Sequence, residues 1–214
     1  MLIFIISIGV FLFMSNYNYN EVMYPTKFVI CGIELKPFSL GHYLLLERLK
    51  NPFLNDDPDL QININEGITQ FYICLIICGH SYEDANELLK NTKLFQKQIK
   101  LFCKALKHNM KQDKNWNIYS KIQLFKDYIN YFTAMPIFEE KGKKSQSMPS
   151  GIDWKQNLFT ISKGEFGYKD SEILNMPLRR LFYEWCSYAE KQGGIRVLSE
   201  MELKQIEMLN NPQI

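Results

Sequence analysis

The segment 167–194, GYKDSEILNMPLRRLFYEWCSYAEKQGG, constrains the fold most strongly, because it combines a helix break, a helix start and a helix stop. Asp170 and Ser171 carry side chains that cap helix starts, so a short helix is expected to begin there. Proline lacks a backbone N–H and clashes with the preceding turn. Pro177 is therefore expected to end the short helix and to open a second one.

The second helix of this segment is predicted to run from Pro177 to Gln192, and Gly193-Gly194 can adopt the positive φ that ends helices. Its apolar residues recur at the spacing of one buried helix face: Leu178, Leu181, Phe182, Trp185 and Ala189. The segment therefore predicts a short helix, a proline elbow and an amphipathic helix. None of these elements carries a catalytic motif.

Apolar periodicity and capping residues predict further helices over 40–49, 66–79, 81–109, 117–135, from 154 to about 164, and from 199 onward. Ser39, Ser81 and Ser199 stand where N-caps are expected. The segment 66–79 is apolar on nearly every side, which indicates a central, buried helix. We expect 81–109 to form one continuous helix roughly 40 Å long.

A β-hairpin is predicted over 27–35, where two short apolar runs flank Cys31-Gly32. An isolated hairpin is marginal in water, so we expect this one to lie on the helix that follows it, 40–49. The predicted fold class is therefore mainly α, a multi-helix soluble domain with one short N-terminal β-hairpin.

Composition divides the chain into four predicted parts. Residues 1–20 form an apolar and then disordered N-terminal segment, and 21–138 form a lobe with the hairpin and most helices. The polar stretch 139–152 is predicted to be a flexible linker. Residues 153–214 form a C-terminal helical lobe.

The first thirteen residues, MLIFIISIGVFLF, are almost wholly apolar. A helix of that length spans about 20 Å, against about 30 Å for a hydrocarbon core. No Lys or Arg precedes Lys27, so the basic region of a signal peptide is missing. The favoured interpretation is translation from Met14, with the apolar run as an upstream extension. An apolar anchor or uncleaved signal remains the alternative.

The chain of 214 residues has five cysteines and no repeated CxxC spacing, which favours free thiols in a reducing compartment. Cys74 and Cys78 share one helix face and His80 follows, which is the best metal-ligand constellation in the sequence. Apolar neighbours favour two core thiols instead, so no metal is expected.

No catalytic or cofactor-binding motif is found. The serine nucleophile pattern GxSxG and the phosphate-binding patterns GxxxxGK[ST] and GxGxxG do not occur. The adjacent carboxylates Asp56-Asp57 and Glu139-Glu140 fall in predicted loops, where solvation accounts for them. We expect a protein that is not an enzyme, with no cofactor and no small-molecule substrate.

Lysines recur every three or four residues along the predicted helix 81–109 and beyond it, at Lys90, Lys93, Lys97, Lys100, Lys104, Lys107, Lys111 and Lys114. Such a row can follow a phosphate backbone, with strongly salt-dependent binding. The net charge of +2 and only four arginines for base recognition favour a solvated face over a nucleic-acid site.

Two parts of the chain resemble a known family. These are FVICGIELKPFSLGHYLLLERLKNPF, residues 28–53, and the residues 154–194, with Trp154 before an apolar helix, Gly167-Tyr168 and the run EILNMPL. Together they resemble the small tail assembly chaperones of tailed bacteriophages and prophages. The resemblance implies a non-enzymatic helical protein in the cytoplasm of a bacterial host. It also implies binding to the long helical tape measure protein during tail assembly.

If the chain acts as such a chaperone, we expect two partner-binding surfaces, part of which should be exposed, although helical spacing by itself favours core or interface packing for the aromatic residues of 125–132. One is the face formed by Leu181, Phe182, Trp185 and Tyr188, and the other is the aromatic row of Phe125, Tyr128 and Phe132. Two other functions stay open. The first is a membrane-tethered helical adaptor anchored by residues 1–13, and the second is a salt-sensitive nucleic-acid binder that uses the lysine-rich helix.

Overall fold

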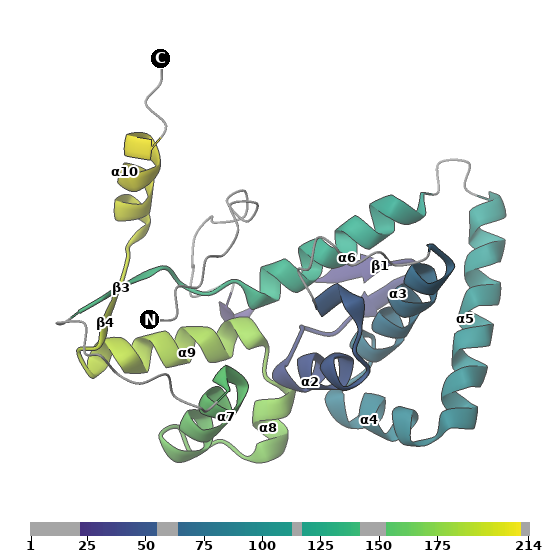
Figure 1. Cartoon of the computed structure of the whole chain (residues 1–214), viewed down its shortest axis with the longest axis horizontal. Coiled ribbons are helices and arrows are strands. Elements are labelled where there is room, and N and C mark those ends of the chain that lie inside the picture. Colours follow the sequence, from purple (N-terminus) through teal and green to yellow (C-terminus); the bar gives the residue numbers. More distant parts are fainter. Residues whose placement is uncertain (1–21, 55–63, 113–116, 142–152, 211–214) are drawn as a thin grey trace. The chain divides into compact units, whose positions relative to one another are not determined.

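The computed structural model describes residues 22–54, 64–112, 117–141 and 153–210, and it is mainly helical with a small antiparallel hairpin near the N-terminus (Figure 1). These residues form nine helices, α2 to α10, and two two-stranded sheets. The predicted fold class is confirmed, and the second sheet adds to it. Among the helices described, none is both long and apolar enough to cross a membrane. The proposed anchor, residues 1–13, lies outside the described residues.

The chain divides into two compact units, and each is built from separate stretches of sequence. The larger unit comprises Thr26–Thr133 and Lys169–Leu178. The smaller unit comprises the described residues among 1–25, 134–168 and 179–214. The predicted lobes, 21–138 and 153–214, stay a prediction, because most of their predicted linker lies outside the described residues.

The predicted hairpin is confirmed as β1 (Phe28–Ile30) and β2 (Ile33–Leu35), with Ile30 opposite Ile33. Cys31 and Gly32 both have positive φ, at 52° and 79°, as a two-residue turn with the right twist requires. The expectation that this hairpin lies on the following helix, 40–49, is wrong, because its main contacts are with two other helices. Phe28 packs edge-on against Tyr128 of α6 (Ile118–Thr133), and Lys36 N–H donates to the Cys78 carbonyl of α3 (Ile64–Cys78) at 2.8 Å.

The core of the larger unit lies between α3 and α6. Helix α3 is buried on almost every side over its second half, as predicted; its buried residues are Phe71, Tyr72, Cys74, Leu75, Ile76, Ile77 and Cys78. Phe71 meets Phe125 of α6 with ring centroids 5.8 Å apart, and Phe53, in the short 3-10 helix η2 (Pro52–Leu54), packs on both rings. Burial of Phe71 and Phe125 stabilises this unit together with aliphatic core residues such as Leu46, Leu75 and Ile77.

Helix α2 (Leu40–Arg48) starts at the predicted cap Ser39 and packs against α8 (Asp170–Asn175). The proline elbow follows α8: Pro177 pairs with Ser39, and Leu178 N–H donates to the Phe38 carbonyl at 2.9 Å. The predicted cap of α8 by Asp170 and Ser171 is wrong. Lys169 occupies the N-cap, and its N–H donates to the Glu172 carboxylate at 2.7 Å, which satisfies that end of the helix from within.

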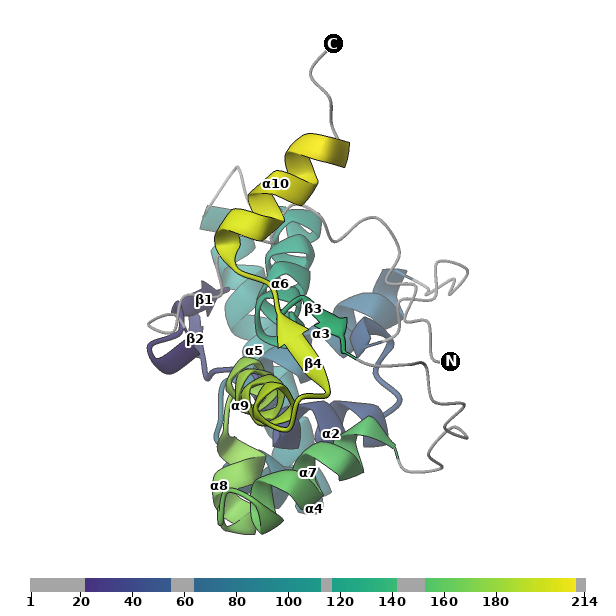
Figure 2. The same cartoon turned by 90° about the vertical axis from the view of Figure 1, so that its left-hand side faces the viewer.

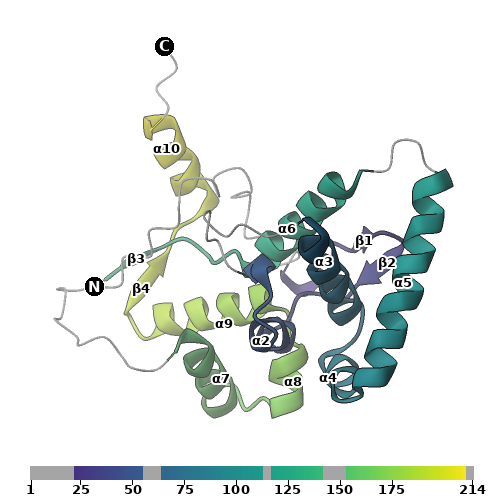
Figure 3. The ribbon, with the colours of Figure 1, turned by 45° about the vertical axis from the view of Figure 1, so that its right-hand side comes forward.

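The expected continuous helix over 81–109 is also wrong, because it is broken at Asn91 into α4 (Tyr82–Lys90) and α5 (Thr92–Gln112). The Asn91 side chain accepts the backbone N–H of Leu94 at 3.1 Å, and its carbonyl accepts from Phe95. Asparagine therefore starts a second helix at a point where the apolar spacing alone continues. Helix α5 lies beside α4 and α3 at the edge of this unit (Figure 3).

The smaller unit contains α7 (Trp154–Gly164), α9 (Leu178–Lys191) after its first residue, and α10 (Glu200–Asn210). Its sheet pairs β3 (Phe138–Glu140) with β4 (Ile195–Val197), and α10 follows β4 directly (Figure 2). The expected loop at Glu139-Glu140 is therefore a strand. Residues 195–197 supply the backbone hydrogen bonds of this strand, so the residues next to Glu139-Glu140 in the sequence do not predict it.

Candidate protein-binding surfaces

The predicted aromatic row on α6 is core in this structure. Phe125, Tyr128 and Phe132 are buried, and Phe28, Phe38 and Phe71 pack against them. The Tyr128 hydroxyl donates to the Lys36 carbonyl at 2.7 Å, which satisfies its polar atom inside the core. These three side chains are therefore not accessible to a partner in this conformation.

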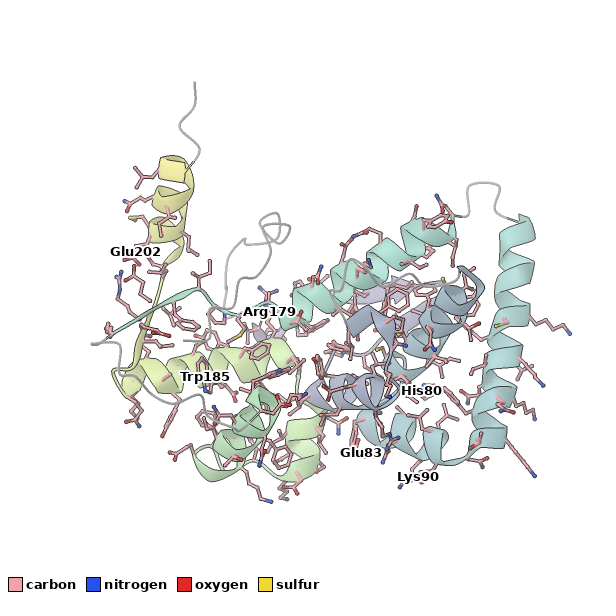
Figure 4. The ribbon with its side chains drawn as sticks, in the orientation of Figure 1. His80, Glu83, Lys90, Arg179, Trp185 and Glu202 are labelled. Atoms are coloured by element: carbon pink, nitrogen blue, oxygen red, sulfur yellow. The ribbon has the colours of Figure 1, made fainter. Side chains whose placement is uncertain are left out.

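The predicted face of α9 is partly accessible. Leu181 and Phe182 are buried, and the Phe182 ring lies 5.8 Å from that of Trp154. Trp185, labelled in Figure 4, is partly exposed and lies 6.0 Å from Phe138 of β3. Tyr188 is also partly exposed, against Phe166. Of the seven predicted partner-binding residues, only these two keep surface available.

Helix α10 carries four exposed large apolar side chains in the smaller unit. Met201, Met208 and Leu209 are 71%, 69% and 79% exposed, and Ile206 is 40% exposed. Methionine side chains are flexible and polarisable, and they recur on protein surfaces that accommodate varied partners. Helix α10 therefore offers an unburied apolar surface.

The start of α10 is fixed by polar contacts. Ser199 N–H donates to Glu202 at 2.9 Å, and Glu202 N–H donates back to the Ser199 hydroxyl, so the predicted N-cap is confirmed and forms a capping box. Arg196 of β4 binds both Glu202 and Glu139 of β3 (Glu202 is labelled in Figure 4). Hydrogen bonds from Ser199, together with Arg196, lower the pKa of Glu202 to about 2. The helix is thus held at its base while its apolar side chains stay in solvent.

Sequence reasoning predicted this helix but not its surface. The signal was present, because a short helix with three Glu, one Lys and one Gln also carries five large apolar residues. Helical spacing alone does not distinguish an apolar face that is buried within the chain from an apolar face that stays exposed on its surface.

The constellation Cys74, Cys78 and His80 does not form a metal site. All five cysteines are thiols; Cys74 and Cys78 are buried, and burial raises the pKa of Cys78 to about 12. The His80 ring nitrogen Nδ1 lies 2.7 Å from the Ile76 carbonyl. No group of His, Cys, Asp and Glu that could hold a metal occurs in the described part of the chain.

Ser39 and His42 form a serine–histidine contact, with Ser39 Oγ 3.1 Å from His42 Nδ1. Both residues are buried, and the Ser39 hydroxyl accepts the His42 backbone N–H as a helix cap. The Ser39 N–H donates to Nδ1, and Nε2 donates to the His80 carbonyl at 2.8 Å. Burial lowers the pKa of His42 to about 4, so this pair is a closed structural network without access for a substrate.

An open hollow of about 820 Å³ lies along α4 and the start of α5. His80, Lys90 and Lys93 line it together with Asp84 and Glu87, and Lys90 pairs with Glu87 (Figure 4 labels His80 and Lys90). Charges of both signs therefore line the hollow, without a concentration of one sign.

The lysine row is exposed as far as its side chains are described. Lys90, Lys93, Lys97, Lys100 and Lys104 are all exposed, whereas the side chains of Lys107 and Lys111, and Lys114 altogether, lie outside the description. The break at Asn91 places Lys90 on α4 and the following lysines on α5. The basic face is therefore a property of α5.

No protein-family model matches the chain, and no curated protein or solved structure is significantly similar to it.

Proposed function

We propose that this chain is a non-enzymatic assembly factor that binds another protein, and specifically that it acts as a phage or prophage tail assembly chaperone. The observation that carries the proposal is the exposed apolar surface of α10, with Met201, Met208 and Leu209. Monomeric soluble proteins rarely leave such side chains clustered in water without a partner. The client would be the long helical tape measure protein, which the resemblance of 28–53 and 154–194 implies.

The chemistry of α10 suits a helical client. Burying a Met or Leu side chain fully contributes about 1.5–3 kcal/mol. Three such side chains can therefore bind an amphipathic client helix whose apolar face is otherwise exposed to solvent. Flexible methionines fit several positions along a repetitive client without one fixed register. Trp185 and Tyr188, which are partly exposed in the same unit, supply further apolar surface.

Co-expression tests the proposal. The full chain is produced together with each product of the neighbouring genes, and the soluble fraction of each product is compared with and without it. The proposal expects one long, helix-rich product that is insoluble alone, becomes soluble with the chain, and co-purifies with it. If the chain changes the solubility of none of these products, the proposal is wrong.

A further inference from the structure

Helix α5 has the most one-sided charge in the chain. Its 21 residues contain six lysines and no Asp or Glu. Lys90, just before it, is neutralised by Glu87. Among the described residues, no carboxylate pairs with Lys93, Lys97, Lys100 or Lys104. The outward face of α5 thus keeps its positive charge, although the whole chain carries only +2.

Two leucines stand in the same outward surface. Leu94 is 44% exposed and Leu101 is 58% exposed. They are seven residues apart, so they form a row of about 10 Å along the helix. Lys97 and Lys104 form a parallel row about 60° further around the helix. The surface is therefore a strip of leucine beside a strip of lysine.

The inner side of α5 is only half covered. Phe102 meets Tyr72 of α3 edge-on at 5.6 Å, yet Phe95, Ile99 and Phe102 all remain partly exposed. No side chain described between Thr92 and Ala105 is buried. Going around the helix, the two leucines and the three half-covered residues thus form one broad apolar face, and the lysines lie along its edge. An apolar face with lysines along its edge is typical of helices that lie in a membrane interface.

We propose that α5 binds the surface of an anionic lipid membrane. The lysines would meet the phosphate headgroups, and Leu94 and Leu101 would enter the boundary between headgroups and acyl chains. Nucleic acid explains this surface less well, since α5 has no arginine for base edges and no fully exposed aromatic ring for stacking, and leucines gain nothing from a phosphate backbone. The helix lies on the membrane in this proposal and does not cross it.

Vesicle flotation with the full chain tests the proposal. One set of vesicles contains equal parts of phosphatidylglycerol and phosphatidylcholine, and the other contains phosphatidylcholine alone. We expect stronger binding to the anionic vesicles and a loss of that difference at high salt. The triple variant Lys97→Gln, Lys100→Gln, Lys104→Gln should bind anionic vesicles about 100-fold more weakly, since each lysine near such a surface contributes about fivefold.

A matched control removes the same charge elsewhere. Lys36, Lys50 and Lys126 are exposed residues of the same unit, and their joint replacement by Gln should leave most of the binding intact. The variant Leu94→Gln, Leu101→Gln should also weaken vesicle binding, with an unchanged circular dichroism spectrum. Equal losses in the two lysine variants would reduce the effect to net charge and overturn the assignment to α5.

Binding to duplex DNA is measured as well, with the same variants and over the same range of salt. Salt-dependent DNA binding that requires the α5 lysines but not the leucines, without preference for anionic vesicles, would overturn the lipid assignment in favour of nucleic acid. Absence of binding to either probe would overturn it as well. This proposal concerns the larger unit and does not depend on the client of α10.

Discussion

The Asn175 side-chain oxygen accepts the backbone N–H of Tyr82 at 3.0 Å, so the end of α8 caps the start of α4 across 93 positions of sequence. The Asn175 amide also donates to both oxygens of Glu83 at 2.7 Å and to the Ser171 carbonyl (Glu83 is labelled in Figure 4). One side chain therefore joins two helices of the larger unit. The segment 169–178 belongs to that unit through this contact and through the pairing at Pro177.

Replacing Asn175 by Ala should lower the free energy of unfolding by about 1–2 kcal/mol, because it removes a helix cap and leaves the Tyr82 N–H without that acceptor. Urea unfolding followed by circular dichroism measures the change. Asn175→Asp keeps the acceptor but places a carboxylate against Glu83, so it should also destabilise, and adding Glu83→Gln should recover part of the loss. Wild-type stability in Asn175→Ala would contradict this role.

Gly41→Ala should be more damaging, because α2 meets α8 and α4 at this residue. A methyl group there would lie 2.6 Å from the Leu174 carbonyl oxygen and 2.5 Å from the Tyr82 ring, so backbone has to move. We expect a loss of about 2 kcal/mol or more, as for overpacked cores. Gly164→Ala is the control: it is also helical, nothing lies within 4 Å of its added methyl, and it should be neutral or slightly stabilising.

His42 should make folding stability depend on pH in the acidic range. Its pKa is about 4 in the folded state, against 6.5 in the unfolded chain, mainly because burial disfavours the charged ring. Between these two pKa values the unfolded chain binds more protons than the folded chain. The contribution of His42 to folding stability is therefore complete above about pH 6.5 and is lost as the pH falls toward 4. The full loss is on the order of 3 kcal/mol.

Urea midpoints measured from pH 7.5 to pH 4 would reveal this loss. His42→Asn should start less stable and show a shallower fall over that range, whereas His80→Gln should keep the wild-type slope, because its backbone carbonyl still accepts from His42. An identical slope in wild type and His42→Asn would show that His42 does not govern the acid response.

The five thiols should separate into two classes. Cys74, Cys78 and Cys186 are buried, and burial raises the pKa of both Cys78 and Cys186 to about 12. Cys31 and Cys103 are partly exposed. Iodoacetamide should therefore modify only Cys31 and Cys103 in the native protein, and all five in guanidinium, because the thiolate is the reacting species. Peptide mapping by mass spectrometry reads the sites, and rapid native labelling of Cys74 or Cys78 would contradict the packing of α3.

Features with local causes were predictable from the sequence. The turn at Cys31-Gly32 and the caps at Ser39, Ser81 and Ser199 depend on neighbouring residues alone, and the structure has all of them. The break at Asn91 also has a local cause, the helix cap that the Asn91 side chain forms with the Leu94 N–H. It was not predicted, because the apolar spacing from Leu88 to Phe95 continues across it and indicates one helix.

Features with distant causes were not predictable. The strand at Glu139-Glu140 exists because residues 195–197 pair with it, and the second acceptor at the start of α4, for the Tyr82 N–H, comes from Asn175. The same limit applies to the candidate surfaces. Phe125 of α6 and Met201 of α10 both stand at helical spacing, yet one is covered by Phe53 and Phe71 while the other is in solvent.

The most direct measurement of the proposed function is the soluble fraction of the co-expressed long helical client with three forms of the chain. These are the wild type, the variant Met201→Gln, Met208→Gln, Leu209→Gln, and the control Leu94→Gln, Leu101→Gln, which removes exposed apolar side chains of α5 instead. The account predicts that wild type and control keep the client soluble. The α10 variant should not, because it should bind the client at least tenfold more weakly, a loss of about 1.4 kcal/mol. An α10 variant that solubilises the client as well as the wild type would contradict a chaperone that binds through this helix.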